Sequence, residues 1–328
     1  MRQGALIPFG VSALLSWLLV GAVRQYALSR VLLDQPTARS SHRAPTPRGG
    51  GLGLVSVVLL TVLALSDARF NPPLLIALAG VALAAAIGWR DDHRSLGVRV
   101  RLVAHGTAGL ALLPVALWPT LVPAGLGLLA ALWWVFWAVS AINVVNFMDG
   151  IDGLIGSQAL IFGLHLASRG AFGGFAAVLG LGLAGAAAGF LVWNWPPSRI
   201  FLGDVGSGAI GLLFVLGGIL LLREGQSSLV TAYLPLYFLF LDATVTLARR
   251  LRRGERVAHA HRSHLYQRLA NGGWGHARVS LLYAGVALIA LPVAALPADS
   301  RSLGIAAYFI GVLALGVALD RLAERLAS

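Results

Sequence analysis

The sequence predicts an all-α integral membrane protein that crosses the bilayer about eleven times. Hydrophobic residues make up 58% of its 328 residues and charged residues only 12%, whereas a soluble domain has about 45–50% and about 25%. The mean hydropathy is +0.80. The apolar residues are grouped in runs near the roughly 20 residues that a helix needs to span a bilayer. Arginines gather between alternate runs.

The apolar runs follow one another along the whole chain. Breaker residues such as Asn71, Pro72 and Pro73 separate them. The first run lacks a clear small-x-small cleavage site, so we interpret it as a retained span rather than a signal peptide. No separate soluble domain fits, and residues 1–328 are interpreted as a single integral membrane domain. The predicted spans cover residues 5–23, 51–66, 73–88, 102–118, 123–145, 153–168, 174–193, 207–222, 229–248, 279–296 and 303–320.

The arginines predict the orientation of the chain. All 25 basic residues are arginine, and the formal net charge is +12. In a soluble protein this charge would indicate nucleic-acid binding, but in a membrane protein arginines mark cytoplasmic loops. With the N-terminus outside and the C-terminus inside, 20 of the 25 fall on the cytoplasmic side. We therefore expect this topology and no nucleic-acid partner. The cytoplasmic segments would be residues 24–50, 89–101, 146–152, 194–206, 249–278 and 321–328.

Several carboxylates fall at the same predicted face. The chain has no cysteine, which excludes thiolate and iron–sulfur chemistry. Adjacent carboxylates at a helix end are costly unless a cation or an arginine neutralises them, and magnesium prefers hard oxygen ligands. The pair Asp91-Asp92 therefore indicates either a metal site or simple pairing with Arg90 and Arg94. The carboxylates of this face are Asp34, Asp91, Asp92, Asp149, Asp152 and Asp204.

Residues 143–153 form the most informative stretch. Asn143, Asn146 and Asp149 are three positions apart, and we expect them to share one face at a helix end. Asp149 and Asp152 each precede a glycine that opens the turn. This loop contains no arginine, so its carboxylates need another partner at the membrane edge. Core packing alone explains the pattern poorly.

Two further aspartates lie near predicted span ends. Asp204 stands between glycines before a helix start, where it can present its carboxylate beside backbone N–H groups. This arrangement suits a metal-bound phosphate, and a helix cap is the alternative. Asp242 lies near the inner end of a span. We expect it to be structural and to pair with Arg249 or Arg250.

The first cytoplasmic segment combines basic residues with glycines and prolines. It carries His42 and Arg48, followed by Gly49, Gly50 and Gly51. Glycine lets backbone N–H groups approach a phosphate, and arginine can bind one with two hydrogen bonds. The segment is either an anion-binding loop or an ordinary basic loop at the lipid surface.

The long segment of residues 249–278 is the most basic of the cytoplasmic loops. It contains His261, Arg262 and His264. Its charge would suit a nucleotide diphosphate, and a plain basic loop beside the membrane is the alternative. The histidine spacings do not form a closed zinc set, and the chain offers no thiolate ligands.

Three of these stretches, in this order, resemble the cytoplasmic motifs of the polyprenyl-phosphate N-acetylhexosamine-1-phosphate transferases, glycosyltransferase family 4. They are Asp91-Asp92, the stretch from Asn143 to Asp152, and Phe201-Leu-Gly-Asp204-Val-Gly-Ser207. The resemblance covers nearly the whole chain. It implies transfer of a sugar 1-phosphate from a UDP-sugar to undecaprenyl phosphate, with release of UMP. It also implies a requirement for Mg²⁺, for which Mn²⁺ could substitute.

The resemblance also implies roles for individual residues. Asp204 would be the main metal ligand, together with Asp149. Asp91 and Asp92 would be catalytic, one of them as a base for the lipid phosphate, and Asp149 and His264 would join them. The residues expected to bind substrate are His42, Arg48, Asn143, Asn146, Asp152, His261 and Arg262.

The histidine segment departs from the family's commoner pattern. His264 matches the first histidine of a His-x-His-His run, but Tyr266 and Gln267 stand where the other two are usual. The form His-Arg-Ser-His-x-Tyr-Gln resembles a branch that initiates O-antigen or other surface polysaccharides. The departure argues against a muramoyl-pentapeptide substrate and leaves the identity of the N-acetylhexosamine open.

The sequence thus predicts a transferase of the bacterial cytoplasmic membrane with its active site at the cytoplasmic face. Its expected partners are undecaprenyl phosphate, a UDP-N-acetylhexosamine and membrane lipid, and a homodimer is left open. Direct transfer and a two-step route through an aspartyl-phosphate both remain open. The alternative is a transporter that uses its carboxylates for ion coupling, although such groups usually lie near the bilayer midplane.

Overall fold

The computed structural model describes residues 3–35, 44–117, 125–171, 173–255 and 261–327. These residues are almost entirely helical, which confirms the predicted all-α class; their strands are a single antiparallel pair of two residues each. The elements are α1 (Gln3–Ser29), β1 (Leu33–Asp34), β2 (Thr46–Pro47), α2 (Gly51–Leu65), η1 (Asp67–Phe70), α3 (Pro72–His93), α4 (Val98–Leu110), α5 (Leu113–Ala116), α6 (Gly127–Met148), α7 (Leu154–Arg169), α8 (Phe175–Asn194), α9 (Asp204–Arg223), α10 (Leu229–Tyr233), η2 (Leu234–Leu236), α11 (Tyr237–Arg252), α12 (Leu265–Leu269), η3 (Ala270–Trp274), α13 (Gly275–Ala294) and α14 (Ala298–Ala327).

Each of the eleven predicted spans corresponds to helix. Within the described residues, nine helical segments are long and apolar enough to cross a membrane, and α2 and α7 are shorter, at 15 and 16 residues. Two predicted spans are interrupted. The run 102–118 divides into α4 and α5, and the run 229–248 divides into α10, η2 and α11 at Pro235. Proline lacks the N–H that a continuous helix uses, so a break at Pro235 is expected. The number of spans remains a prediction.

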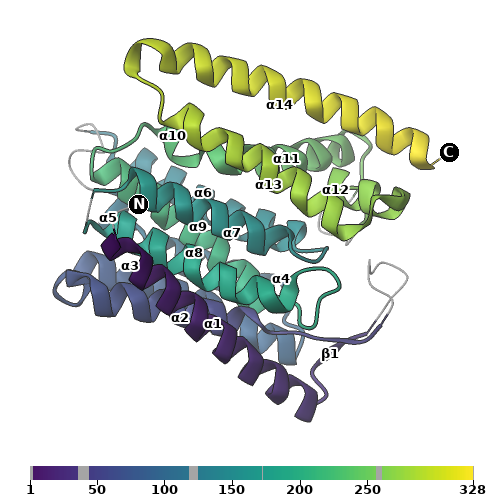
Figure 1. The fold of residues 1–328 in the computed structure, drawn as a ribbon, viewed down its shortest axis with the longest axis horizontal. Helices are drawn as coiled ribbons and strands as arrows, with labels where there is room; N and C mark the ends of the chain where they lie inside the picture. The colour runs from purple at the N-terminus through teal and green to yellow at the C-terminus, as the bar shows by residue number, and fades with distance from the viewer. Residues whose placement is uncertain (1–2, 36–43, 118–124, 172, 256–260, 328) are drawn as a thin grey trace.

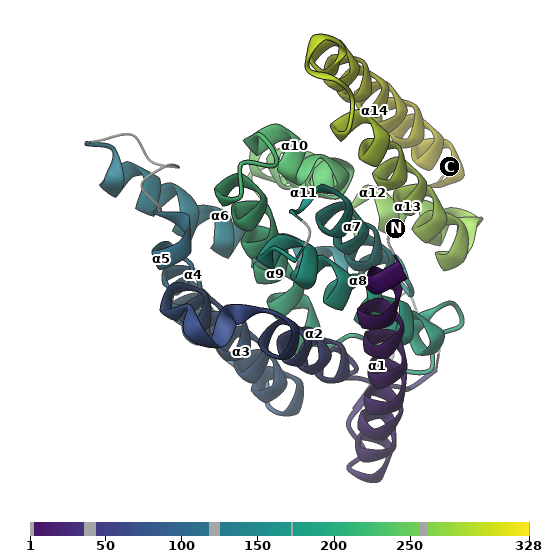
Figure 2. The ribbon, with the colours of Figure 1, turned by 60° about the vertical axis from the view of Figure 1, so that its left-hand side comes forward.

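Helix α9 forms the centre of the bundle. It packs against α3 and α6 on one side and against α2, α7 and α8 on the others (Figure 2). Nearly every residue from Val205 to Leu221 is buried. Its glycines allow close approach, because small residues let membrane helices pack backbone to backbone. A methyl group at Gly211 would lie 2.7 Å from the Cα atom of Ile142 on α6.

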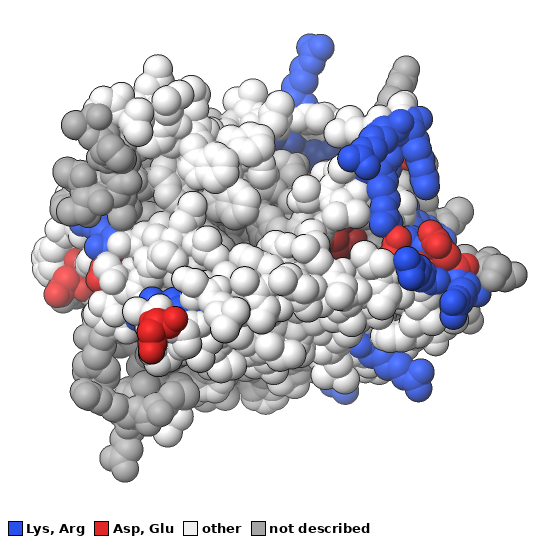
Figure 3. All heavy atoms as spheres, turned by 90° about the horizontal axis from the view of Figure 1, so that it is seen from above, with Lys and Arg blue, Asp and Glu red and all other residues white. Residues whose placement is uncertain are grey.

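The outer helices present an apolar surface. Leu128, Leu129 and Phe136 on α6, and Leu303 and Ile310 on α14, are among many large exposed hydrophobic side chains. Figure 3 shows most charged side chains towards the two ends of the molecule, with an uncharged expanse between them. Such an expanse is unfavourable in water and suits lipid. The chain is therefore a multi-pass membrane protein.

The two ends of the bundle differ. The start of α1 lies at one end, whereas the end of α14 lies near α12 at the other end, which also carries β1 (Figure 1). This arrangement agrees with an odd number of crossings, as predicted. The assignment of the end that carries β1 and α12 to the cytoplasm remains a prediction. The polar motifs of the sequence meet at this end.

Candidate active site

A polar cavity of about 260 Å³ opens at the end of the bundle that carries β1 and α12. The last turn of α3, the turn after α6, the first turn of α9 and the start of α13 contribute to its wall. Segments more than 100 residues apart therefore share one site. The lining residues are Asp34, Arg48, Asp92, Asn146, Asp149, Gly150, Ile151, Asp152, Asn194, Phe201, Leu202, Gly203, Asp204, Ser207, Gln267 and His276.

The side chain of Asp92, which lies on α3, caps the first turn of the central helix α9. Its two carboxylate oxygens each accept a backbone N–H, from Asp204 and Val205, at 3.1 Å. These N–H groups belong to the first turn of α9, which has no partner for them within the helix. Gly203 adopts a φ of +77° and a side chain there would crowd the Asp92 carboxylate. Asp92 thus joins the end of α3 to the start of α9, and its side chain is only 1% exposed.

Asp204 is held by the amide of Asn146. The Nδ2 atom of Asn146 donates to Oδ1 of Asp204 at 2.7 Å and to the Ser207 hydroxyl oxygen at 3.2 Å. Asn146 lies in the last turn of α6, so this contact ties α6 to α9. One carboxylate oxygen of Asp204 is thereby oriented while the residue still lines the cavity.

Asp149 ends α6 and faces the other carboxylates. Burial and the negative charges of Asp204, Asp92 and Asp152 together hold the pKa of Asp149 well above its ordinary range. A cluster of like charges in a partly buried cavity is unfavourable unless a cation enters it. The electrostatics of the site therefore favour the binding of a cation.

The turn that carries Asp149 is supported from α12. The hydroxyl of the fully buried Tyr266 donates to the backbone carbonyl of Phe147 at 2.8 Å. A side chain at Gly150 would overlap the Tyr266 hydroxyl group. Glycine at position 150 is thus required for close contact with the tyrosine, and Tyr266 fixes the end of α6.

Asp152 forms a separate polar group at the cavity wall. Its carboxylate accepts hydrogen bonds from the Ser198 hydroxyl at 2.9 Å and the Ser198 N–H at 3.2 Å, and it lies 3.2 Å from Nδ1 of His276. Burial alone would raise the pKa of Asp152, but the hydrogen bonds from His276 and Ser198 outweigh it and lower the pKa. Asp152 is therefore a stable carboxylate.

The glycines after Arg48 serve packing. The N–H groups of Gly50 and Gly51 donate to the backbone carbonyls of Phe201 and Leu202, at 2.9 and 2.8 Å. A methyl group at Gly51 would overlap the backbone of Gly206. The hypothesis that these glycine N–H groups approach a phosphate is therefore wrong, because they already bond the segment before α9.

Arg48 itself lies in the cavity wall. It donates to the backbone carbonyl of Asp92, and its Nε atom is 3.9 Å from the Asp92 carboxylate. Arg48 thus lines the cavity, and its expected contact with substrate stays a prediction. His42 lies outside the described residues.

Asp91 and Asn143 do not line the cavity. Asp91 pairs with Arg101 at 3.3 Å, rather than with the neighbouring Arg90 or Arg94. The Asn143 amide donates to the Val139 carbonyl of its own helix at 2.7 Å. Successive positions three apart rotate by about 60° around a helix, so Asn143 and Asp149 diverge although each is near Asn146 in sequence. The expectation that all three share one face is wrong.

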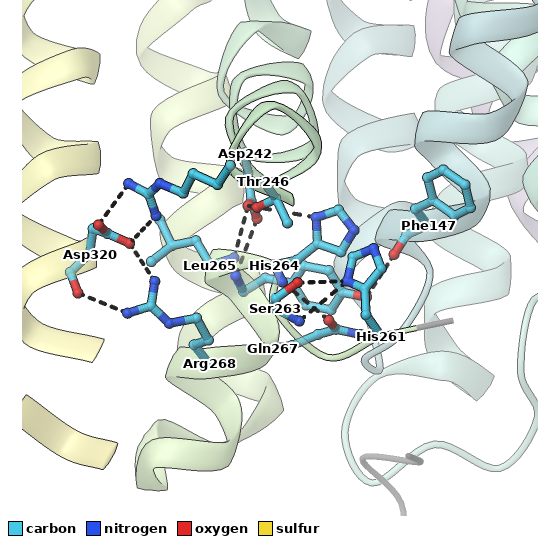
Figure 4. A network of polar contacts seen from close by, with 12 residues as sticks. Phe147, Asp242, Thr246, His261, Ser263, His264, Leu265, Gln267, Arg268 and Asp320 are labelled. Atoms are coloured by element: carbon cyan, nitrogen blue, oxygen red, sulfur yellow. Dashed lines mark hydrogen bonds and ion pairs between the residues drawn. The ribbon is translucent and has the colours of Figure 1, made fainter. Parts of the chain in front are cut away.

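The histidine segment packs behind the cavity. Leu265 and Tyr266 donate their N–H groups to Asp242 at 2.8 and 3.2 Å (Figure 4). The Tyr283 hydroxyl also donates to Asp242, at 2.7 Å. His264 is 1% exposed, with Nδ1 at 3.8 Å from the Asp242 carboxylate. Asp242 is structural, as predicted, but it caps α12.

The arginines expected to pair with Asp242 have other partners. Arg249 binds Asp320 of α14 through two hydrogen bonds of 2.7 and 2.8 Å, and Arg250 binds Glu255 at 2.8 Å. Arg268 joins the same Asp320 (Figure 4). The predicted pairing was wrong because Asp320 of α14 lies closer to Arg249, and Glu255 lies closer to Arg250.

His261 and Arg262 also lie outside the cavity lining. The Nδ1 atom of His261 is 2.8 Å from the Ser263 hydroxyl, and its ring centre is 4.8 Å from that of His264. Burial, followed by the charges of His264 and Arg250, lowers the pKa of His261 to about 4. A neutral His261 adds no positive charge for a nucleotide at neutral pH. The substrate contacts of His261, Arg262 and His264 stay predictions.

The cavity includes residues that were not singled out from the sequence as ligands. His276 and Asn194 lie at helix ends, Asp34 ends β1, and Gln267 lies in α12. Asp34 had been noted as one carboxylate among several, and Gln267 as a departure from the family's histidine run. The predicted start of the last but one span at residue 279 placed His276 outside any motif, and no local pattern marks it.

The donor set fits a magnesium ion held partly by substrate. Among the described residues, no three acidic or histidine side chains converge tightly enough to coordinate a metal by themselves. Magnesium is commonly bound by one or two carboxylates together with substrate phosphates and water. Asp149 and Asp204 supply two such carboxylates at one cavity, and burial and the neighbouring carboxylates, which raise the pKa of Asp149, disfavour its charged form unless a cation binds there.

The fold and the cavity together define a multi-pass membrane protein with a carboxylate-rich site at one end. The family model for glycosyl transferase family 4 matches residues 74–222, which hold Asp92, Asn146, Asp149 and Asp204. The chain belongs to this family, a family of phospho-sugar transferases. The predicted resemblance is thereby confirmed.

Similar proteins cover most of the chain. The phospho-N-acetylmuramoyl-pentapeptide-transferase of Synechococcus sp. (strain JA-3-3Ab) is 30% identical over 85% of this chain and 88% of its own length. The decaprenyl-phosphate N-acetylglucosaminephosphotransferase of Mycolicibacterium smegmatis is 31% identical, over 90% and 82%. A probable undecaprenyl-phosphate N-acetylglucosaminyl 1-phosphate transferase of Bacillus subtilis is 26% identical, over 94% and 88%.

Proposed function

We propose that the protein transfers an N-acetylhexosamine 1-phosphate from a UDP-sugar to undecaprenyl phosphate and releases UMP. The observation that carries this proposal is the cavity where Asp92, Asn146, Asp149 and Asp204 meet at one end of an apolar helix bundle. Such a position gives access both to a lipid in the bilayer and to a water-soluble nucleotide. The names of similar proteins support the same reaction class.

The reaction forms one phosphorus–oxygen bond and breaks one. An oxygen of the lipid phosphate bonds to the β-phosphorus of the UDP-sugar, and the bond from that phosphorus to the bridging oxygen breaks as UMP leaves. A phosphate monoester loses its second proton near pH 6, so the attacking oxygen is largely deprotonated at neutral pH. Transfer in this form needs no protein base.

The positions of Asp91 and Asp92 favour direct transfer over an aspartyl-phosphate. Both oxygens of Asp92 accept N–H groups from α9, and Asp91 is paired with Arg101 and does not line the cavity. A nucleophile needs an uncommitted oxygen facing its target. We infer that Asp92 shapes the site and that the lipid phosphate is the nucleophile.

Asp149 and Asp204 would hold Mg²⁺, or Mn²⁺ in its place. When bound, the metal neutralises diphosphate oxygens and stabilises the leaving UMP. Asn146 orients one oxygen of Asp204, and Arg48 adds positive charge at the cavity wall. The carboxylates then favour the metal-bound substrate over the free nucleotide.

We further propose that the enzyme lies in the bacterial cytoplasmic membrane and starts O-antigen or another surface polysaccharide. The support is the predicted topology and the His-Arg-Ser-His-x-Tyr-Gln form of residues 261–267. Similar proteins include both N-acetylglucosamine and muramoyl-pentapeptide transferases, so a panel of sugars is needed. The transporter alternative finds no support. A transporter would hold its coupling carboxylates near the bilayer midplane, whereas here they line a cavity at one end of the bundle, and the similar proteins are transferases.

The decisive experiment measures UMP release by the purified chain in detergent. Undecaprenyl phosphate, MgCl₂ or MnCl₂ and a panel of UDP-N-acetylhexosamines would be supplied, with UDP-N-acetylmuramoyl-pentapeptide as a further donor. We expect UMP release with an N-acetylhexosamine donor, and we expect this release to require both lipid and metal. The substitution Asp204→Asn should reduce it at least 100-fold. No release with any donor from folded protein would contradict the proposal.

A further inference from the structure

His276 is a cavity residue to which the proposed reaction assigns no role. It lies in the first turn of α13, directly after the π-helical turn η3. Gly273 and Gly275 there have φ values of +99° and +72°, which L side chains rarely adopt. This change of direction brings the first turn of α13 to the cavity wall, where the His276 side chain is 17% exposed.

Asp152 fixes the orientation of the His276 ring. The distance from Nδ1 of His276 to Oδ2 of Asp152 is 3.2 Å. Asp152 is itself held by Ser198 through two hydrogen bonds, and its backbone carbonyl accepts from the Ser280 hydroxyl at 2.8 Å. A carboxylate that engages one imidazole nitrogen determines the direction of the other. Nε2 is therefore the ring atom left for a ligand.

Other polar side chains of the wall are already engaged with the protein. Asn146 donates to Asp204 and Asn194 to a backbone carbonyl at 3.0 Å, whereas Arg48 gives one of its donors to a backbone carbonyl of α3. Five aspartates also line the cavity. An anionic substrate therefore needs hydrogen-bond donors beyond a metal, and Nε2 of His276 is a ring nitrogen that can supply one.

We propose that His276, positioned by Asp152, binds the diphosphate of the nucleotide-sugar donor through Nε2. This inference rests on the proposed function, because it deepens the description of the same site. The ligand class is a nucleoside diphosphate. Loss of a hydrogen bond to a charged group should weaken donor binding about tenfold or more without changing the affinity for the lipid phosphate.

Two substitutions separate ligand binding from a purely structural role. The amide nitrogen of asparagine occupies nearly the position of Nδ1 and that of glutamine nearly the position of Nε2. His276→Asn therefore keeps a donor for Asp152 and removes the donor for substrate, whereas His276→Gln does the reverse. Leu281→Ala, on α13 with a residue exposure of 58% and outside the cavity lining, is the matched control.

The measurements are kcat, the KM for the UDP-sugar, the KM for undecaprenyl phosphate and the apparent Tm of the purified full chain. We expect His276→Asn to raise the donor KM at least tenfold with the lipid KM and Tm unchanged, and His276→Gln to raise it less than threefold. An unchanged donor KM in His276→Asn would overturn the inference. An equal rise in both KM values together with a lower Tm would also overturn it.

The remaining outcomes are also decisive. If His276→Asn does not fold, a donor KM within threefold of the native value in His276→Gln supports the inference, and a tenfold rise overturns it. If the unsubstituted enzyme releases no UMP with any donor, the proposed function fails and this inference fails with it. If His276→Asn has native activity and native kinetic constants, this inference fails but the proposed function stands.

Discussion

At the residue scale, the roles of the polar side chains depend on their partners. Asn143 and Asn146 are the same residue type on the same helix, yet Asn143 bonds its own backbone while Asn146 orients Asp204. Asp91 and Asp92 are neighbours, yet one pairs with Arg101 and the other caps α9. Each pair therefore provides a comparison in which chemistry is constant and position differs.

We predict that Asn146→Ala lowers kcat/KM about 10- to 100-fold, the usual effect of removing a group that orients a metal-binding residue. The loss should be smaller at high MgCl₂, because Asp204 remains present. UMP release would be measured across a series of MgCl₂ concentrations. Asn143→Ala is the matched control and should remain within about twofold of the native enzyme. Equal losses in the two variants would argue against the assigned role of Asn146.

At the element scale, the site depends on close contacts between helices. Gly88 of α3 faces the first turn of α9, and a methyl group there would overlap the backbone carbonyl of Asp204. Gly51 of α2 meets Gly206 in the same way. Since packed interiors yield little to added volume, Gly88 sets the distance between the helices that carry Asp92 and Asp204, and Gly51 sets the distance of α2 from α9.

Gly88→Ala should therefore destabilise the protein by about 1–3 kcal/mol, the usual cost of overpacking, and should reduce UMP release by displacing Asp204. Thermal unfolding in detergent and activity would be measured together. Gly106→Ala on α4 is the control, since nothing lies within 4 Å of a methyl group there and alanine favours helix. A Gly88→Ala enzyme with native stability would show that α3 and α9 can separate without cost.

At the scale of the whole molecule, one helix can report the orientation. Helix α14 runs from one end of the bundle to the end that carries the cavity, with Asp299 and Glu324 exposed near its two ends. Ion pairs of Asp320 with Arg249 and Arg268 hold the C-terminal part of α14 against the rest of the bundle (Figure 4). The cavity end and the end of α14 are predicted to face the cytoplasm.

Single cysteines at these two positions would test the orientation, because the chain has no cysteine of its own. We predict that Asp299→Cys reacts with a membrane-impermeant maleimide in spheroplasts, whereas Glu324→Cys reacts only after the membrane is permeabilised. The two variants control each other for expression and reactivity once the membrane is opened. The reverse pattern would place the cavity outside and contradict the predicted topology.

The sequence alone determined the all-α membrane class, the approximate positions of its helices and most carboxylates of the cavity. Membrane helices are set by local runs of apolar residues, whose transfer into lipid depends little on distant parts of the chain. Asp92, Asp149 and Asp204 could be found because they stand in short polar motifs at the ends of such runs. The breaks in the predicted spans at 102–118 and 229–248 were missed, although Pro235 marks one of them.

The tertiary structure alone decided which polar groups meet. It showed that Asp92 caps α9, that Asp242 caps α12, and that His276 joins Asp152 across 124 residues of sequence. It also showed that the glycines after Arg48 bond the chain before α9 rather than a phosphate. The physical reason is that a polar group is satisfied by whichever partner packing brings within hydrogen-bond distance, and helix packing is not a local property of the sequence.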